Sequence, residues 1–301
     1  MDQIVEKAPA KLNLTLEIIG RRNDGFHDLM SVMQTVDLHD VVRCHVTDDS
    51  ALTFECNVKE LSNENNTVYK SAVELRDYAV SKGWRRNSLG AAIKLAKKIP
   101  IAAGLAGGSS DAAATLRALN ALWKLNLSMT ELVSLSLKVG CDVPFLVSGG
   151  TALVGGRGEL ITQLPSAVIP GYVTIVVPEW NPDGQGEGLS KSGTLFKHIT
   201  SAHFSAVCVS SSLTEKVRRR ETVVDDDLAN VFKSVVNQAF PGWNSFHSNL
   251  EHGCSQRFAL SGTGPAMYAL GCDKTTATQA MHIADRAGNF KAVQAFCTSL
   301  E

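Results

Sequence analysis

The sequence predicts an α+β protein. Three observations lead to this fold class: 44% of the 301 residues are hydrophobic, strand-like alternation fills the chain up to residue 46, and helices and strands then mix without regular βαβ alternation. A chain of this length and hydrophobic content can form a large core and two lobes. The sequence contains no internal repeat.

Apolar periodicity sets the expected elements. Leu12, Leu14, Leu16 and Ile18 alternate as in a half-buried strand, and residues 66–82 repeat apolar side chains at helical spacing. The expected strands are 10–20, 29–38, 41–46, 89–95, 172–177, 258–260, 266–270 and 290–297, with a turn between the second and the third. The expected helices are 66–82, 109–124, 130–139, 228–239 and 274–286, with a hairpin around Gly149 to Gly156 and a loop over 178–192.

Composition excludes several classes of function. The formal net charge is −1, so we expect neither nucleic acid nor a membrane surface as a partner. The seven cysteines are odd in number, widely spaced and lack a Cys-x-x-Cys pair, which predicts reduced thiols rather than disulfides or a zinc site. No apolar run reaches the roughly 20 residues of a membrane span, and no targeting segment is seen, so we expect a cytoplasmic protein.

The glycine-rich segment from Pro100 to Ala114 reads Pro-Ile-Ala-Ala-Gly-Leu-Ala-Gly-Gly-Ser-Ser-Asp-Ala-Ala-Ala. Its glycines and the free amides of a following helix suit an anion such as phosphate. The same residues also suit an ordinary capped helix, with Ser109 or Ser110 as N-cap. The spacing matches neither the P-loop nor the dinucleotide-binding fingerprint. On these residues alone both interpretations stay open.

Other polar residues have structural explanations when each is taken alone. Lys11 and Asn13 share one face of the first predicted strand, which is usually the solvent face. Asp142 precedes a proline and is typical of a turn or a helix cap, and Asp24-Gly-Phe26-His27 is typical of a hairpin corner. The glycine-rich turn 260–266 could direct amides toward an anion or simply close a hairpin.

In combination, the order and spacing of these segments resemble the GHMP kinase superfamily. The matching segments are Pro-Ala-Lys-Leu-Asn-Leu from Pro9, the glycine-rich segment, Cys-Asp-Val-Pro-Phe from Cys141 and Leu-Ser-Gly-Thr-Gly-Pro from Leu260. Lys-Leu-Asn-Leu together with Arg-x-Asp-Gly-Phe-His and Asp-Val-Pro-Phe is most similar to the members that act on a cytidine diphosphate ester of methylerythritol. The resemblance covers residues 8 to 165 well and is patchier from 180 to 255.

The resemblance implies a two-lobe fold. Residues 1–165 would form an ATP-binding, catalytic lobe similar to domain 2 of ribosomal protein S5, and 166–301 a ferredoxin-like lobe that completes the substrate pocket. The expected reaction is transfer of the γ-phosphate of ATP to the 2-hydroxyl of cytidine diphospho methylerythritol, in non-mevalonate isoprenoid precursor synthesis. The alternatives are another GHMP kinase, of homoserine or mevalonate type, or a non-catalytic nucleotide-binding paralogue. We expect a monomer or a weak homodimer.

The resemblance also implies roles for individual residues. Asp142 would accept the hydroxyl proton, and Lys11 would lie beside it and stabilise developing negative charge. Mg²⁺ would bind mainly through the ATP phosphates and weakly to Ser110. The substrate would contact Asn13, Phe26, His27 and, weakly, Thr194. ATP would contact Asn66, Lys97, Pro100, Gly104, Leu105, Ala106, Gly107, Gly108, Ser109 and Ser110.

Three residues depart from the usual family pattern. Phe26 replaces a common tyrosine, which keeps base stacking but loses the phenol hydroxyl. Ala106 replaces a usual glycine, which puts a positive φ at this position in doubt. Cys141 replaces a usual alanine and has no histidine near it in sequence, so it is not expected to act as a nucleophile. Asp111 would lie close to a bound anion, so we expect its side chain to point away from the ligand.

Overall fold

The computed structural model describes residues 2–178, 191–205, 208–286, 293–298 and 300. The chain folds into two compact units, each built from separate stretches of sequence. Unit 1 comprises Met1–Lys11, Leu38–Ile101 and Ala106–Gly149, and unit 2 comprises Leu12–Asp37, Ala102–Leu105 and Gly150–Glu301. The expectation of one continuous boundary at residue 165 stays a prediction. The mixture of helices and strands confirms the predicted α+β class.

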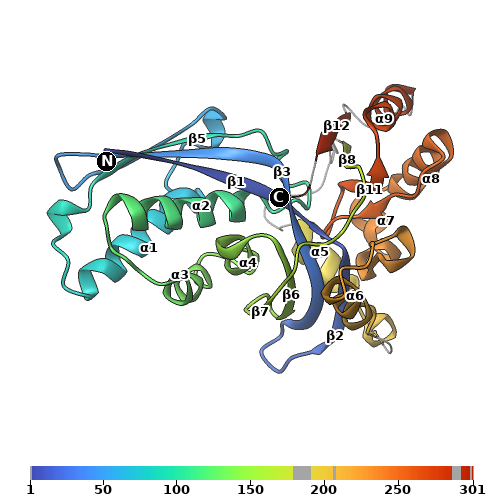
Figure 1. Ribbon diagram of the computed structural model, residues 1–301, viewed down its shortest axis with the longest axis horizontal. Coiled ribbons are helices and arrows are strands. Elements are labelled where there is room, and N and C mark those ends of the chain that lie inside the picture. The colour runs from blue at the N-terminus through green and yellow to red at the C-terminus, as the bar shows by residue number, and fades with distance from the viewer. Residues whose placement is uncertain (1, 179–190, 206–207, 287–292, 299, 301) are drawn as a thin grey trace. The chain divides into compact units, whose positions relative to one another are not determined.

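Unit 1 combines strands with a group of helices. The strand β5 pairs antiparallel with the second half of β3 and parallel with β4. Helix α1 packs against α2, and α4 packs against both α2 and α3 (Figure 1). The bounds are β1 (Gln3–Asn13), β3 (His27–Val46), β4 (Leu52–Cys56), β5 (Ala91–Ala96), α1 (Thr67–Ser81), α2 (Gly107–Leu122), α3 (Met129–Ser136) and α4 (Val143–Ser148), β1 and β3 also contributing residues to unit 2.

A single long strand, β3, replaces the two strands and the turn expected between residues 29 and 46, so that part of the prediction was wrong. Polar residues at 37, 39 and 40 interrupt the apolar pattern and suggested a turn. Asp40 is instead fully buried within the strand, where its carboxylate accepts hydrogen bonds from the amides of Lys98 and Ile99. These partners lie almost sixty residues further along the chain, so nothing in the sequence near Asp40 indicates that the strand continues through it.

Unit 2 contains two groups of strands. The first half of β3 pairs antiparallel with β2 and β6, and β6 continues into the hairpin with β7. The second group has the order β10-β11-β8-β12 with antiparallel neighbours. The bounds are β2 (Thr15–Arg21), β6 (Thr151–Gly156), β7 (Leu160–Leu164), β8 (Tyr172–Pro178), β9 (Ala229–Asn230), β10 (Ala259–Leu260), β11 (Met267–Cys272) and β12 (Val293–Thr298).

The helices of unit 2 pack around a core rich in aromatic side chains. Phe232, Phe240, Trp243, Phe246 and Phe258 are all buried in one cluster. Helix α9 packs against α8, β8 and β12. The helix bounds are α5 (Lys191–His198), α6 (Val209–Arg218), α7 (Val236–Ala239), α8 (Trp243–Cys254) and α9 (Lys274–Arg286). Among the described residues no helix combines the length and apolarity that a membrane span requires.

The helix expected over 228–239 is not formed as one element. The chain instead makes the short strand β9, a 3₁₀ turn (Val231–Ser234) and the single helical turn α7. Asn230 explains the break, because its side chain accepts from the Phe232 amide and donates to the carbonyls of Leu260 and Gly262. These contacts hold residue 230 in an extended conformation that a helix cannot include.

Candidate active site

Lys11 and Asp142 lie together in unit 1. Lys11 is on β1 with only 4% of its side chain exposed, and its Nζ is 3.7 Å from Oδ2 of Asp142, whose side chain is 35% exposed. Asp142 occupies the N-cap position of α4, yet its carboxylate makes no capping hydrogen bond. The carboxylate is therefore available to Lys11 and to a ligand, whereas a purely structural N-cap would use it on the helix.

Asn13 and Lys11 do not lie on a solvent face. Asn13 is 1% exposed, and its side-chain amide donates to Ser31 Oγ at 2.8 Å. Two buried polar side chains on one strand carry a desolvation cost that a solvent-facing pair would avoid. The alternative that the pair is merely surface polarity is therefore wrong, while the substrate role of Asn13 stays a prediction.

Helix α2 begins three or four residues earlier than an N-cap at Ser109 or Ser110 would place it. Its first residue is Gly107, and its N-cap is Ala106, which offers no side-chain acceptor. The amide of Ser110 already donates to the Ala106 carbonyl at 2.9 Å, so the amides without an intrahelical acceptor are those of residues 107–109. The expected N-cap role of Ser109 or Ser110 is thus wrong, and the first turn of α2 carries uncapped amides with the positive end of the helix dipole.

Within unit 1 the start of α2 touches the segments that carry both polar residues of the pair. The hydroxyl of the buried Ser110 donates to the Pro9 carbonyl at 2.6 Å, two residues before Lys11. A Cβ on Gly140, two residues before Asp142, would lie 3.9 Å from Ser109 Oγ. The uncapped helix start and the Lys11–Asp142 pair therefore belong to one local arrangement. The expected contact of Ser110 with Mg²⁺ stays a prediction.

The loop before α2 has positive φ at alternate residues, with values of 55° at Ala102, 87° at Gly104 and 54° at Ala106. Ala106 therefore does adopt a positive φ, although its Cβ disfavours one, and the doubt raised from the sequence was wrong. A left-handed conformation costs an alanine about 1–2 kcal/mol. Leu105 is buried, so only its backbone is available to a ligand, and Pro100 directly precedes the loop.

The two glycine-rich segments of the sequence meet within unit 2. The amide of Ala266 donates to the Ala103 carbonyl at 3.0 Å, and Ser261 Oγ donates to the Gly104 carbonyl at 3.2 Å. A Cβ on Gly104 would lie only 2.4 Å from the Ser261 carbonyl oxygen. The position therefore requires glycine for its φ and for its close approach to the turn.

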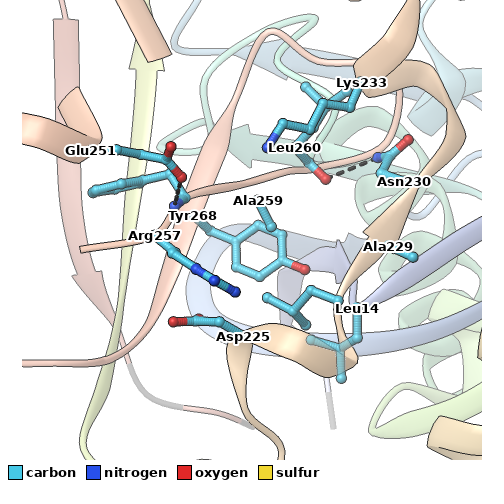
Figure 2. Close-up of a pocket in the computed structure, with 12 residues that line it drawn as sticks. Leu14, Asp225, Ala229, Asn230, Lys233, Glu251, Arg257, Ala259, Leu260 and Tyr268 are labelled. Carbon is cyan, nitrogen blue, oxygen red and sulfur yellow. Dashed lines mark hydrogen bonds between the residues drawn. The ribbon is translucent and has the colours of Figure 1, made fainter. Parts of the chain in front are cut away.

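A hollow of about 280 Å³ in unit 2 shows how the second glycine turn and β1 are held (Figure 2). The side-chain amide of Asn230 donates to the Leu260 carbonyl, which anchors the start of that turn. The fully buried Tyr268 lines the hollow, and its hydroxyl donates to the Asn13 carbonyl at 2.7 Å. Tyr268 thereby fixes the backbone of the residue expected to contact substrate.

The two residues expected near the ATP base are both engaged in protein contacts. Asn66 is the N-cap of α1: its Oδ1 accepts from the Val68 amide at 2.9 Å and its Nδ2 donates to the Leu61 carbonyl. The ammonium of Lys97 is buried and bonds to Asp40 and to Asp111 Oδ2, the latter at 2.8 Å. Their proposed contacts with ATP are not tested by these observations and stay predictions.

Lys97, Asp40 and Asp111 form a buried triad. The sequence analysis did not identify Asp40 as a member of it. Burial disfavours the charged form of Lys97, but the two carboxylates outweigh it and raise its pKa. Burial and the neighbouring Asp40 raise the pKa of Asp111 to about 8, against the opposing effect of Lys97. Asp111 Oδ1 is buried without a hydrogen-bond partner among the described residues. The side chain of Asp111 thus points to Lys97.

Phe26 and His27 lie at the hairpin corner that leads into β3. Phe26 is 47% exposed, and the Arg157 guanidinium lies 3.8 Å from its ring centroid. His27 stacks on Phe196 with 5.4 Å between ring centroids. Burial, with a smaller effect of Arg21, lowers the pKa of His27, so its imidazole is neutral at pH 7.

The remaining substrate prediction cannot be placed. Thr194 belongs to α5, but its side chain lies outside the described residues, as does much of the loop expected over 178–192. Arg157 is the residue that the sequence reasoning missed at the Phe26 corner. It stands between two glycines in the 155–158 turn, a position that suggested only a hairpin.

Comparison with known proteins gives the arrangement a family. Residues 66–150 match the model of the GHMP kinases N terminal domain. The 4-diphosphocytidyl-2-C-methyl-D-erythritol kinase of Exiguobacterium sibiricum is 36% identical over 278 residues, which are 89% of this chain and 88% of that protein. A crystal structure of 4-(cytidine 5'-diphospho)-2C-methyl-D-erythritol kinase superposes with a TM-score of 0.76 at 26% identity, covering 99% of each chain.

A homoserine kinase of Cytophaga hutchinsonii has a TM-score of 0.67 at 18% identity, covering 100% of this chain and 95% of its own, and so shares the fold. The first relative combines substantial identity with nearly full coverage of both chains. The chain therefore belongs to the 4-diphosphocytidyl-2-C-methyl-D-erythritol kinase family of the GHMP kinases.

Proposed function

We propose that the protein is an ATP-dependent kinase that phosphorylates the 2-hydroxyl of 4-diphosphocytidyl-2-C-methyl-D-erythritol, in the non-mevalonate route to isoprenoid precursors. The observation that carries the proposal is the 3.7 Å pair of Lys11 and Asp142 beside the uncapped start of α2. Phosphoryl transfer depends mainly on positioning and charge stabilisation, and unit 1 supplies groups for both. A protein that only bound a nucleotide would need neither member of the pair.

Asp142 is the general base in this proposal. As the substrate oxygen forms its bond to the γ-phosphorus and the bond to the leaving ADP oxygen breaks, a carboxylate oxygen of Asp142 takes the hydroxyl proton. The ammonium of Lys11 stabilises the negative charge that develops on the attacking oxygen. The partial exposure of Asp142 leaves its carboxylate within reach of a substrate, whereas the buried Lys11 is held in one position.

The first turn of α2 would bind the triphosphate. Its uncapped amides and the helix dipole favour phosphate oxygens. Mg²⁺ bound to the ATP phosphates would neutralise charge on the transferred group. Ser110 is the proposed protein contact; its hydroxyl hydrogen is donated to Pro9, which leaves the oxygen lone pairs as the atoms that a cation could use.

The test is ADP release with the cytidine substrate by the wild type and by Asp142→Asn. We expect kcat to fall at least about 10²-fold, which is about 2.7 kcal/mol of barrier, because the amide cannot accept the proton. Asp77→Asn is the matched control, since Asp77 is exposed and pairs with the exposed Arg86, and it should keep the wild-type rate.

Two outcomes would contradict the proposal. A near-normal rate in Asp142→Asn would make Asp142 a structural residue. Turnover of homoserine or mevalonate without turnover of the cytidine compound would place the protein with another GHMP kinase activity.

A further inference from the structure

Arg157 is stacked on the exposed Phe26 ring. It lies in the turn between β6 and β7, and its guanidinium carbon is 3.8 Å from the ring centroid. This contact holds the guanidinium over the aromatic face, as in a cation–π pair. Because both residues belong to unit 2, the contact is defined within one compact part of the chain.

The hydrogen-bond donors of this guanidinium lack protein acceptors. Among the residues that the structure describes, the side chain of Arg157 donates no hydrogen bond, and its Nε is buried without a partner. Unmatched charged donors are costly inside a folded protein and call for an explanation. By contrast, Arg22 in the neighbouring turn bonds to both Asp24 and Asp28.

The nearest acidic groups are already committed elsewhere. The Asp24 carboxylate bonds to Arg22 and to the Phe26 amide, so its effect on Arg157 is through space only. The Glu159 carboxylate accepts from the backbone amide of Arg157 rather than from its side chain. With no protein acceptor among the described residues, the donors of this partly exposed guanidinium are left to water or to a ligand.

We infer that Arg157 is a substrate-binding residue that contacts the diphosphate of the cytidine diphosphate substrate; this inference rests on the proposed function. A guanidinium is always charged, and its planar fork matches a pair of phosphate oxygens. A neutral cytosine offers no negative charge to pair with it. The neighbouring His27 is neutral at pH 7, and Arg22 is already paired with Asp24 and Asp28, whereas Arg157 has donors to spare. Stacking on Phe26 orients those donors before substrate arrives, which limits the entropy lost on binding.

Affinities for cytidine, CMP and CDP, measured by calorimetric titration, test this role. In the wild type, affinity should rise as phosphates are added. In Arg157→Ala, the affinity for CDP should fall about tenfold or more while that for cytidine changes less than about twofold, because only the phosphate contact is lost. Arg157→Lys, which keeps the charge but not the fork, should lie between the two.

Arg219→Ala is the matched control, since Arg219 is 71% exposed, and it should keep all three affinities. The KM for ATP should be unchanged in every variant, and thermal melting should show that each variant is folded. If Arg157→Ala weakens the three ligands equally, or none of them, the diphosphate contact is refuted. Failure of the wild type to turn over the cytidine substrate would contradict the proposed function itself. This result is distinguishable from failure of the Arg157 proposal, which is measured by comparing the variants with the wild type.

Discussion

The buried carboxyl of Asp111 should make folding stability depend on pH, and Asp111→Asn should remove that dependence. Asp111 is 2% exposed, its Oδ2 accepts from Lys97, and its Oδ1 has no partner among the described residues. With the carboxyls of Asp111 and Asp40 facing a single ammonium, one carboxyl is better accommodated as the neutral acid. Asparagine has the same shape as that acid and keeps an acceptor for Lys97.

The sign and the size follow from proton linkage. The folded protein holds the Asp111 proton up to about pH 8, whereas the unfolded chain releases it at about pH 3.9. Between these values the folded state binds one more proton than the unfolded state, so stability is lost as pH rises, by about 1.4 kcal/mol per pH unit. Asparagine does not titrate and contributes no such slope. The stability of the variant relative to the wild type should therefore rise by about 3 kcal/mol from pH 5.5 to pH 7.5.

Urea unfolding of both proteins at several pH values between 5.5 and 9 measures this difference. Titratable groups remote from Lys97, Asp40 and Asp111 titrate alike in both proteins and cancel in the comparison. Asp77→Asn, at a 55% exposed side chain, is the control and should follow the wild-type pH profile. A difference between Asp111→Asn and wild type that stays constant with pH would show that Asp111 is ionised in the folded protein, and the reasoning would be refuted.

Two further substitutions test the loop and the catalytic pair. Gly104→Ala should lower the free energy of unfolding in urea by about 2–5 kcal/mol, because its Cβ would combine a strained φ of 87° with a 2.4 Å approach to the Ser261 carbonyl. Gly150→Ala is the control for strain alone, since Gly150 has a φ of 72° and open space around it. An equal loss of stability in both variants would argue against the clash. Lys11→Ala should lower kcat at least about 10²-fold with little change in the KM for ATP in the ADP-release assay, and a rise in KM without loss of kcat would remove Lys11 from the transition state.

Periodicity and end signals were sufficient for two of the longer helices. The helices expected over 66–82 and 274–286 are formed as α1 and α9, since apolar spacing and local caps act within one segment. Helix α6 was not expected, because its N-terminus is satisfied from a distance. The Glu17 carboxylate on β2 accepts hydrogen bonds from the amides of Val209 and Ser210. The residues next to α6 in the sequence give no N-cap signal, since the N-cap residue Cys208 makes no side-chain capping hydrogen bond.

The candidate active site shows the same difference between residues recognised from local motifs and residues whose partners are distant in sequence. The resemblance to the GHMP kinases, carried by the order and spacing of the motifs, identified Lys11 and Asp142, and the structure brings the two together. Asp40 could not be found in this way, since an isolated aspartate in an apolar strand gains its meaning only from the Lys97 ammonium that the fold places beside it. Residues that act through partners distant in sequence are the ones that local patterns miss.

The left-handed Ala106 shows how such distant partners determine the shape of the loop. A Cβ on Gly107 would lie 3.0 Å from Lys97 Nζ and 3.1 Å from Ile99 Cγ2, so the first residue of α2 has no room for a side chain. The hydrogen bond between Lys97 and Asp111 connects the second turn of the same helix to the residue that follows β5. With α2 held from below, the residue before it must take the tight turn at φ 54°, although glycine would do so with less strain. The positive φ at Ala106 thus accompanies a helix start that is packed closely against Lys97 and Ile99 and that carries no side-chain cap.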